Sequence, residues 1–512
     1  MKQKWLKKLF RRRMFVILLI ALQLAVILYL VISGTKTSIY VSWSLNALSL
    51  LAALHAINRK DNAAYKLIWV FLILLFPVFG GLFYLLYRVQ SSPRKFRKRL
   101  SEIEQKSKPL FLLPGDEYEA ACGTAQDCVP QIHYLQQFAG FPVYQNTKTK
   151  YLSPGEEKFR YLLEKLRAAK KYIFLEYFII REGIMWNAVL KILRAKAKEG
   201  VDVRVMYDDM GCFLLLPNDY PKQLRSMGIQ CTVFNSFRPR LSSLQNNRDH
   251  RKIAVIDGTV AFTGGINLAD EYINTYEKHG HWKDASIMLE GKAAWSFTLM
   301  FLQMWEVCNN AKEDYQKYYP YETATQWLQE TDGFVQPYAD SPIDQENVGE
   351  HVYLQMINNA KRYVYINTPY LIIDDNMLSA LTLAAKSGVD VRIVTPHQPD
   401  KWVVHMTTRS YYRELIAAGV KIYEYSQGFM HAKTFVSDDR AATVGTTNMD
   451  FRSLYLHFEC GVWLYGSKAV KEVYDDFVQT LKECQSISMK DLRGHLPTRC
   501  LQNIFRLFAP LM

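Results

Sequence analysis

The residues best suited to chemistry in this sequence form a motif that occurs twice. Each copy contains a His, a Lys two positions later, and then an Asp, a Gly and an Asn at matching distances. A lone His-x-Lys pair arises by chance on many strands, but five matched positions at one lag of 181 residues are hard to explain by packing alone. The first copy is His250, Lys252, Asp257, Gly264 and Asn267, and the second is His431, Lys433, Asp438, Gly445 and Asn448.

Two such copies could exchange the alcohol of a phosphodiester. A neutral imidazole is a competent nucleophile near pH 7, and a second imidazole can protonate the departing alkoxide and later deprotonate the incoming alcohol. Lys252 and Lys433 would place positive charge on the phosphoryl oxygens, and Asn267 and Asn448 would add hydrogen bonds there. The motif therefore predicts one site, shared by two parts of the chain, that needs neither a metal ion nor a cofactor.

The repeat extends to the elements that must position these residues. In both copies an aromatic-rich strand pattern precedes an apolar helical pattern, and a Gly-Val-Asp-Val-Arg strand pattern follows the helix. Strand, helix and strand in succession predict βαβ units. The strand patterns are 172–180, 200–205 and 228–234 in the first copy and 363–372, 388–393 and 419–425 in the second, and the helical patterns are 188–198 and 378–386.

These patterns predict an α/β protein with two homologous half-domains, each built on a mixed, largely parallel sheet. We expect the halves at 130–330 and 331–512, a linker at 100–129 and a membrane-anchor region at 1–99. The last twelve residues, 501–512, could be an amphipathic segment on lipid or a helix docked on the core, and the sequence favours neither.

Three apolar runs, at 14–33, 39–57 and 67–87, predict an N-terminal transmembrane helical region. The first has no charge, the second contains Asn46 and His55, and the third contains Pro77, Gly80 and Gly81, which disfavour a straight helix. Two spans and a re-entrant third segment would keep every basic cluster in the cytoplasm, as the positive-inside rule requires, together with the catalytic region. Alternatively, the second run lies in the interface and the other two span the membrane.

The net charge of +14 is concentrated in this N-terminal region. The first 100 residues contain seventeen Lys and Arg and one acidic residue, so the remainder carries a net charge of −2. A nucleic-acid-binding surface depends on clustered basic residues. The near-neutral remainder therefore argues against a nuclease, and the basic run at 94–99 beside an apolar segment favours contact with anionic lipid headgroups.

At the duplicated motif the sequence resembles the phospholipase D superfamily, whose mark is two copies of HxKxxxxD with a later Gly and Asn. Within that superfamily it is similar to the bacterial cardiolipin synthases. The similarity rests on the Pro-Val-Phe-Gly-Gly break at 77–81, the Asn-Met-Asp-Phe-Arg-Ser stretch at 448–453 and the hydrophobic C-terminus, and it extends from about the second apolar run onward. His457 is a departure, because such sequences commonly carry Asn there.

This resemblance implies phosphatidyl transfer between two phosphatidylglycerol molecules, which gives cardiolipin and glycerol through a covalent phosphohistidine. It implies His250 as the nucleophile and His431 as the acid and base, although the symmetric spacing does not distinguish them. Acids downstream of the motifs would orient the imidazoles; Asp284 and Glu459 fit best, and Glu271 competes with Asp284. The motif acids Asp257 and Asp438 are expected to cap or bridge rather than carry protons.

Other functions remain open at this point. A membrane-bound phospholipase D would release phosphatidic acid if water reached the covalent intermediate, and a nuclease could use the same His and Lys residues. A catalytically silent scaffold is disfavoured by the intact motifs. We expect an enzyme of the bacterial cell membrane whose partners are phosphatidylglycerol and anionic lipids, not nucleic acid.

Overall fold

The computed structural model describes most of the chain, in two compact units. One unit comprises residues 1–96 and 237–246, and the other comprises 97–236 and 247–512. The described residues are 25, 36–60, 62–76, 80–81, 83–85, 91–111, 117–236, 243–320, 332–344, 346–492 and 496–512.

The N-terminal unit contains helices α2 (Lys36–Ile57) and α3 (Ala63–Leu75), which pack against each other through a small apolar cluster. Of the predicted membrane segments, 14–33 lies outside the described residues apart from position 25, 39–57 falls within α2, and 67–87 is interrupted where α3 ends, two residues before Pro77. In the described part of the chain, no helix is both long enough and apolar enough to cross a bilayer.

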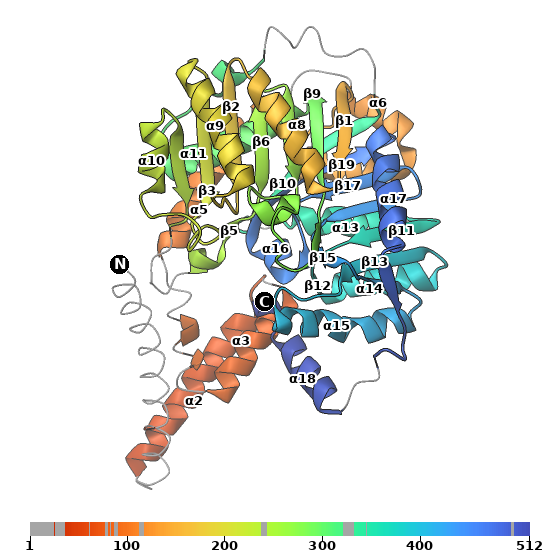
Figure 1. The fold of residues 1–512 in the computed structure, drawn as a ribbon. Helices are drawn as coiled ribbons and strands as arrows, with labels where there is room; N and C mark the ends of the chain where they lie inside the picture. The colour runs from red at the N-terminus through yellow and green to blue at the C-terminus, as the bar shows by residue number, and fades with distance from the viewer. Residues whose placement is uncertain are drawn as a thin grey trace. The chain divides into compact units, whose positions relative to one another are not determined.

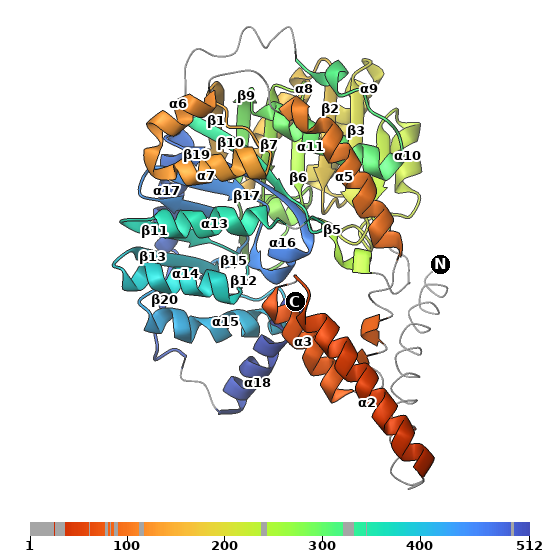
Figure 2. The same cartoon turned by 180° about the vertical axis from the view of Figure 1, so that it is seen from behind.

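The first of the two homologous halves is a seven-stranded sheet with helices on both faces. Helices α8 (Gly155–Ala168) and α9 (Ile184–Lys198) cover one face, and α11 (Ala294–Asn309) covers the other, as the two opposite views show (Figures 1 and 2). The strand order is β1 (Thr147–Leu152), β9 (Ser286–Gly291), β7 (Val260–Gly264), β6 (Lys252–Ile256), β2 (Tyr172–Tyr177), β3 (Asp202–Asp208) and β4 (Gln230–Phe234).

The second half repeats this plan. Helices α13 (Val348–Asn359) and α14 (Asp375–Lys386) lie on one face of its sheet, and α17 (Lys468–Leu481) lies on the other (Figures 1 and 2). The strand order is β10 (Phe334–Asp340), β19 (His457–Tyr465), β17 (Ala441–Gly445), β16 (Thr434–Ser437), β11 (Tyr363–Asn367), β13 (Asp390–Pro396), β14 (Lys421–Tyr425) and β20 (Cys484–Ile487).

The sheets are mixed, as predicted, but the expectation of largely parallel pairing is wrong. Parallel pairs occur at β2-β3-β4 and β11-β13-β14, where a helix connects β2 to β3 and β11 to β13. The other neighbours in both main sheet orders are antiparallel. The physical reason is the motif itself: only three residues join β6 to β7, and so short a connection can form only a hairpin.

The range 100–129, expected to be a linker, is largely helical where the structure describes it. Helix α5 (Ser91–Phe111) packs beside α11: Trp295 Nε1 donates to the Leu110 carbonyl at 2.9 Å, and Gln303 Nε2 donates to Ser107 Oγ at 2.8 Å. Helix α6 (Glu117–Thr124) and the short helix Gln126–Cys128 follow. Because α11 is buried nearly all around, the helix that covers it adds to the catalytic unit.

The C-terminal tail contributes to helix α18 (Leu496–Leu507), which docks on α15 (Trp402–Ala417). Arg506 forms a 3.0 Å ion pair with Glu414, and the rings of Phe505 and Trp402 are 5.7 Å apart. The helix nevertheless leaves apolar side chains exposed, with Ile504 53% and Leu507 43% accessible. Docking on the protein therefore does not use all of its apolar surface.

Candidate active site

Each motif is fixed in place by its aspartate. Asp257 and Asp438 lie in the turns of the β6-β7 and β16-β17 hairpins, with backbone φ angles of 53° and 55°. The Asp257 carboxylate accepts three backbone N–H groups at the start of β2, from residues 170–172, and the Asp438 carboxylate accepts three at the start of β11, from residues 361–363. Both aspartates thus tie a motif hairpin to the neighbouring strand, and neither contacts a motif histidine in these bonds.

The backbone just before each motif pairs with a strand of the opposite half. Strand β5 (Arg248–Asp249) runs parallel to the start of β19, and His250 N donates to the Phe458 carbonyl at 2.9 Å. Strand β15 (Gly428–Met430) runs parallel to β8 (His281–Lys283), and His431 N donates to the Lys283 carbonyl at 2.7 Å. The two halves therefore exchange equivalent contacts.

The acids are exchanged in the same way. His250 Nδ1 and Glu459 Oε1 form a hydrogen bond of 2.9 Å, and His431 Nδ1 and Asp284 Oδ2 form one of 2.6 Å, with Lys433 Nζ also 2.9 Å from His431 Nδ1. Asp284 and Glu459 are fully buried, and each holds the histidine of the half to which it does not belong. A Nδ1–H bond to a carboxylate fixes the tautomer and leaves Nε2 as the reactive nitrogen.

Sequence reasoning selected both acids but did not foresee the exchange. Glu271, the competing candidate, instead lies 3.8 Å from Arg181. The second oxygens of the two acids are satisfied differently: Thr446 Oγ1 donates to Glu459 Oε2 at 2.5 Å, and the Ala285 N–H donates to Asp284 Oδ1 at 2.7 Å.

Gly265 takes the position of Thr446 in the first half. A Cβ atom on Gly265 would lie 2.0 Å from Asp284 Oδ1, so the carboxylate requires a glycine there. The sequence analysis did not select Thr446 as a site residue. Its position between Gly445 and Asn448 of the second motif copy could have indicated that its hydroxyl lies at the site.

Burial sets the protonation of both histidines. Burial, followed by the charges of Lys252, His457, Lys433 and His431, holds the pKa of His250 well below its usual range. Burial and then Lys433 lower the pKa of His431 to about 4, against the opposing effect of Asp284. Since His431 and Lys433 affect His250, the two motifs are within electrostatic reach of each other. Both imidazoles are neutral at pH 7 in the empty site, as a nucleophile requires.

The motif lysines are also affected by burial. Burial lowers the pKa of Lys252 to about 8 and that of Lys433 to about 7. Each ammonium donates to the carbonyl of its own motif histidine, Lys252 to His250 and Lys433 to His431. Burial also raises the pKa of Glu459 to about 8, with Lys252 opposing this shift. A phosphate bound beside the lysines would supply the negative charge that this buried site lacks.

The motif asparagines are engaged mainly with the protein. Asn267 Oδ1 accepts the Ile179 N–H at 3.0 Å, and its Nδ2 donates to Tyr272 Oη at 2.7 Å. Asn448 Nδ2 donates to Asp450 Oδ2 at 3.0 Å. Their direct bonds to a phosphate therefore remain a prediction, and in the empty site they brace the loops that follow the motifs.

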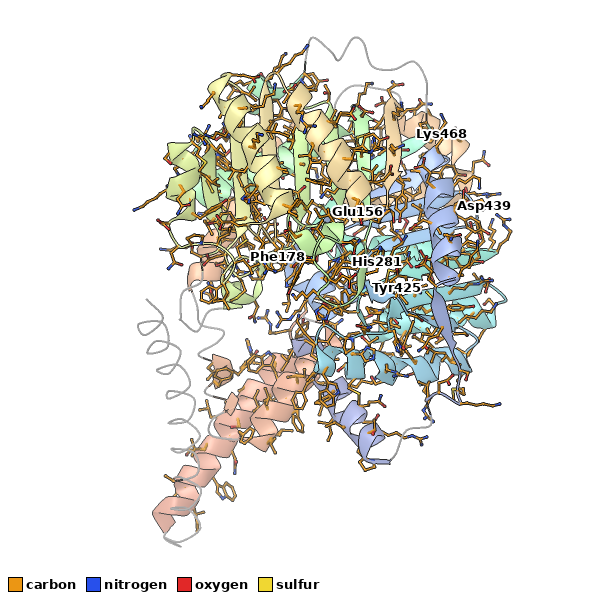
Figure 3. All side chains as sticks on the ribbon, viewed as in Figure 1. Glu156, Phe178, His281, Tyr425, Asp439 and Lys468 are labelled. Carbon is orange, nitrogen blue, oxygen red and sulfur yellow. The ribbon has the colours of Figure 1, made fainter. Side chains whose placement is uncertain are left out.

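Aromatic rings flank both histidines. Trp282 and Phe429 lie 5.1 and 5.9 Å from the ring of His431, whereas Phe178 and His457 lie 5.0 and 5.4 Å from the ring of His250. Figure 3 labels Phe178, and it also labels His281 and Tyr425, whose side chains form a 2.9 Å hydrogen bond across the halves. The surroundings of His431 are the more apolar of the two.

Comparison with known proteins agrees with this duplicated arrangement. A family model described as "Cardiolipin synthase, PLD-like domain" matches residues 162–294 and 353–481, together more than half of the chain. The chain belongs to this phospholipase D-like cardiolipin synthase family. A second model, "Phospholipase_D-nuclease N-terminal", matches residues 47–88. The family match therefore contains both motif histidines and their neighbouring strands.

Relatives match along nearly the whole chain. An uncharacterized protein of Streptococcus mutans is 44% identical over 462 residues, which is 90% of this chain and 99% of that protein. A cardiolipin synthase of Alkalihalophilus pseudofirmus is 35% identical over 486 residues, which is 92% of this chain and 95% of the relative. The crystal structure of phosphatidylserine synthase from Haemophilus influenzae has the same fold, with a TM-score of 0.54 at 15% identity, over 71% of this chain and 93% of that one.

Proposed function

We propose that this protein is a cardiolipin synthase, a phosphatidyltransferase that joins two phosphatidylglycerol molecules into cardiolipin and releases glycerol. The observation that carries the proposal is the reciprocal pairing of His250 with Glu459 and of His431 with Asp284. It provides two oriented imidazoles and two lysines for one phosphodiester. Family membership and the full-length cardiolipin synthase relatives support the choice of lipid.

The reaction proceeds in two displacements. His250 Nε2 attacks the phosphorus of the first phosphatidylglycerol, the bond from phosphorus to the headgroup oxygen breaks, and protonated His431 gives its proton to the departing glycerol. A hydroxyl of the second phosphatidylglycerol then loses its proton to His431 and attacks the phosphorus. The bond to His250 breaks, and cardiolipin leaves with both histidines in their starting states.

Substrate binding itself prepares the acid. In the empty site burial and Lys433 hold the pKa of His431 at about 4, so the imidazole carries no proton to give at pH 7. An anionic phosphodiester beside Lys433 offsets that positive charge and favours the imidazolium. The acid is therefore charged with the substrate in place, while Lys252 and Lys433 stabilise the phosphoryl oxygens.

The proposal includes the bacterial cell membrane as the place of action. Residues 1–99 form the membrane anchor, and the basic clusters of this region keep the catalytic unit on the cytoplasmic side. Helix α18 contributes a lipid contact of its own, since Ile504 and Leu507 are exposed on a helix that also carries Arg499 and Arg506. Anionic lipids suit this combination of apolar and basic side chains.

Product analysis tests the function. Purified protein in vesicles that contain phosphatidylglycerol labelled in the headgroup glycerol should release labelled glycerol and form cardiolipin in equal amounts. The His250→Ala variant should form neither product. Phosphatidic acid with no cardiolipin would instead establish a hydrolase and refute the proposal.

A further inference from the structure

His457 is a buried histidine with no hydrogen-bond partner among the described residues. Its side chain is 10% exposed, and both Nδ1 and Nε2 are buried without a donor or acceptor within reach. Its Nδ1 is 3.8 Å from Glu459 Oε1, too far for a hydrogen bond, and its ring centroid is 5.4 Å from that of His250. An unsatisfied buried polar group destabilises a protein, so the position of His457 beside His250 indicates a ligand that would satisfy it.

Trp282 occupies the equivalent place in the other half. It precedes Asp284 by two residues, as His457 precedes Glu459, and its ring is 5.1 Å from that of His431. Its indole Nε1, a donor only, is also buried without a partner among the described residues. Each half therefore presents one unused ring N–H beside the histidine of the opposite half.

We propose that His457 and Trp282 are a second pair of donors, which bind oxygen atoms of the substrate on the two sides of the phosphorus. His457, beside the nucleophile His250, binds an oxygen of the phosphatidyl group, and Trp282, beside the acid His431, binds a hydroxyl of the glycerol headgroup. This inference rests on the proposed function for the identity of the lipid and for the roles of the two histidines.

The charges around His457 favour an oxygen ligand over a metal ion. His250, His457 and Glu459 do offer ligand atoms within 4.8 Å of one another, a spacing compatible with a divalent metal. However, burial and the nearby charges of Arg452, Lys252, Arg248 and Lys401 hold the pKa of His457 well below its usual range. The same positive charges that disfavour protonation of His457 also repel a metal ion. They attract the negative charge of a phosphodiester.

Paired substitutions of similar size test the donors. His457→Leu and Trp282→Phe remove the N–H and keep an apolar side chain, whereas His457→Gln and Trp282→His retain a donor. We expect the first two to lower kcat/KM for phosphatidylglycerol about 10- to 100-fold, and the donor-retaining variants to stay within about fivefold of the native protein. Each variant that loses the donor should melt no lower than its donor-retaining partner of similar size, because the two share the same loss of packing and the N–H is unsatisfied in the empty protein.

A second donor lipid assigns the ligands of the two side chains. With phosphatidylethanol as the donor lipid, whose headgroup has no free hydroxyl, Trp282→Phe should lose its effect on formation of the phosphatidyl-enzyme, whereas His457→Leu should keep it. Equal activity of the Leu and Gln variants, or a donor-free variant that melts below its donor-retaining partner, would overturn the proposal. So would stoichiometric zinc binding that requires His457. Absence of cardiolipin with the native protein would instead refute the proposed function.

Discussion

At each reactive histidine, the imidazole is held by a carboxylate that belongs to the other half of the chain. The His250–Glu459 and His431–Asp284 bonds fix the tautomer, and burial of both carboxylates excludes water as a competing partner. In the proposed mechanism, the catalytic unit at this scale is therefore a pair of residues from distant parts of the sequence, not the HxK motif alone.

Replacement of either acid by its amide should affect catalysis strongly. We expect Glu459→Gln and Asp284→Asn to lower kcat about 100-fold or more, since the amide no longer favours the Nδ1–H tautomer. Steady-state kinetics with phosphatidylglycerol would measure this. Glu271→Gln is the matched control, because Glu271 lies beside Arg181 rather than a histidine, and its kcat should remain within about threefold. Equal effects of all three substitutions would contradict an orienting role.

Binding of an anion should weaken as the pH rises. Burial lowers the pKa of Lys433 to about 7 and that of Lys252 to about 8, so the empty site loses both protons between pH 7 and 9. A bound phosphodiester favours the protonated lysines, and binding above these pKa values must therefore take up protons. We expect the Kd of glycerophosphoglycerol, whose charge is constant in this range, to rise roughly 10- to 100-fold from pH 7 to 9. Calorimetry would measure it, and a Kd independent of pH would show that the lysines remain charged when the site is empty.

At the scale of elements, the motif hairpins are held by their aspartates. Asp257→Asn or Asp438→Asn should lower the free energy of unfolding by about 1–3 kcal/mol, because an amide cannot accept three backbone N–H groups as a carboxylate does. Denaturant unfolding would measure the loss, and kcat per folded molecule should change little. Asp439→Asn is the control: its ion pair with Arg362 is more than half exposed, so its loss should cost less than about 1 kcal/mol. A large fall in kcat without loss of stability would assign Asp257 a chemical role.

The sequence predicted local elements better than their partners. The strand patterns at 172–180 and 200–205 and the helical pattern at 188–198 correspond to β2, β3 and α9, because periodicity reports which face of an element is buried. It did not report that α5 covers α11, because the buried positions Leu100, Ile103, Ser107 and Phe111 recur at helical spacing but do not identify the helix on which they pack. Most strand pairs in both sheets are antiparallel, which the sequence patterns did not predict. The βαβ units explain only the parallel pairs, whereas the short connections from β6 to β7 and from β16 to β17 form hairpins.

At the site, too, the sequence indicated the individual residues but not the residues with which they pair. The lag of 181 residues indicated that His250 and His431 are equivalent, and both orienting acids were selected by resemblance. Their exchange between halves is a tertiary property: it depends on the pairing of β5 with β19 and of β15 with β8, which short strands of two or three residues do not signal in sequence. His457 was visible only as an unusual residue, and its missing partners required coordinates.

At the scale of the whole molecule, the two motifs should form one reaction centre. Rapid quenching of turnover with labelled phosphatidylglycerol should therefore trap at most one phosphatidyl group per chain. The label should be lost in His250→Ala and should accumulate in His431→Ala when a donor with a good leaving group is used, because that variant lacks the base for the second step. Two groups per chain would show that the halves act as independent sites.

The exchange of contacts between β5 and β19 and between β15 and β8 has the geometry of an isologous interface, in which each surface offers the other what it receives. One half alone contains a histidine but not the acid that holds it, so neither half has a complete histidine–acid pair. Because both halves lie in one chain, their pairing does not depend on protein concentration. The two surfaces also need not be identical, and equivalent places hold Gly265 and Thr446, or Trp282 and His457.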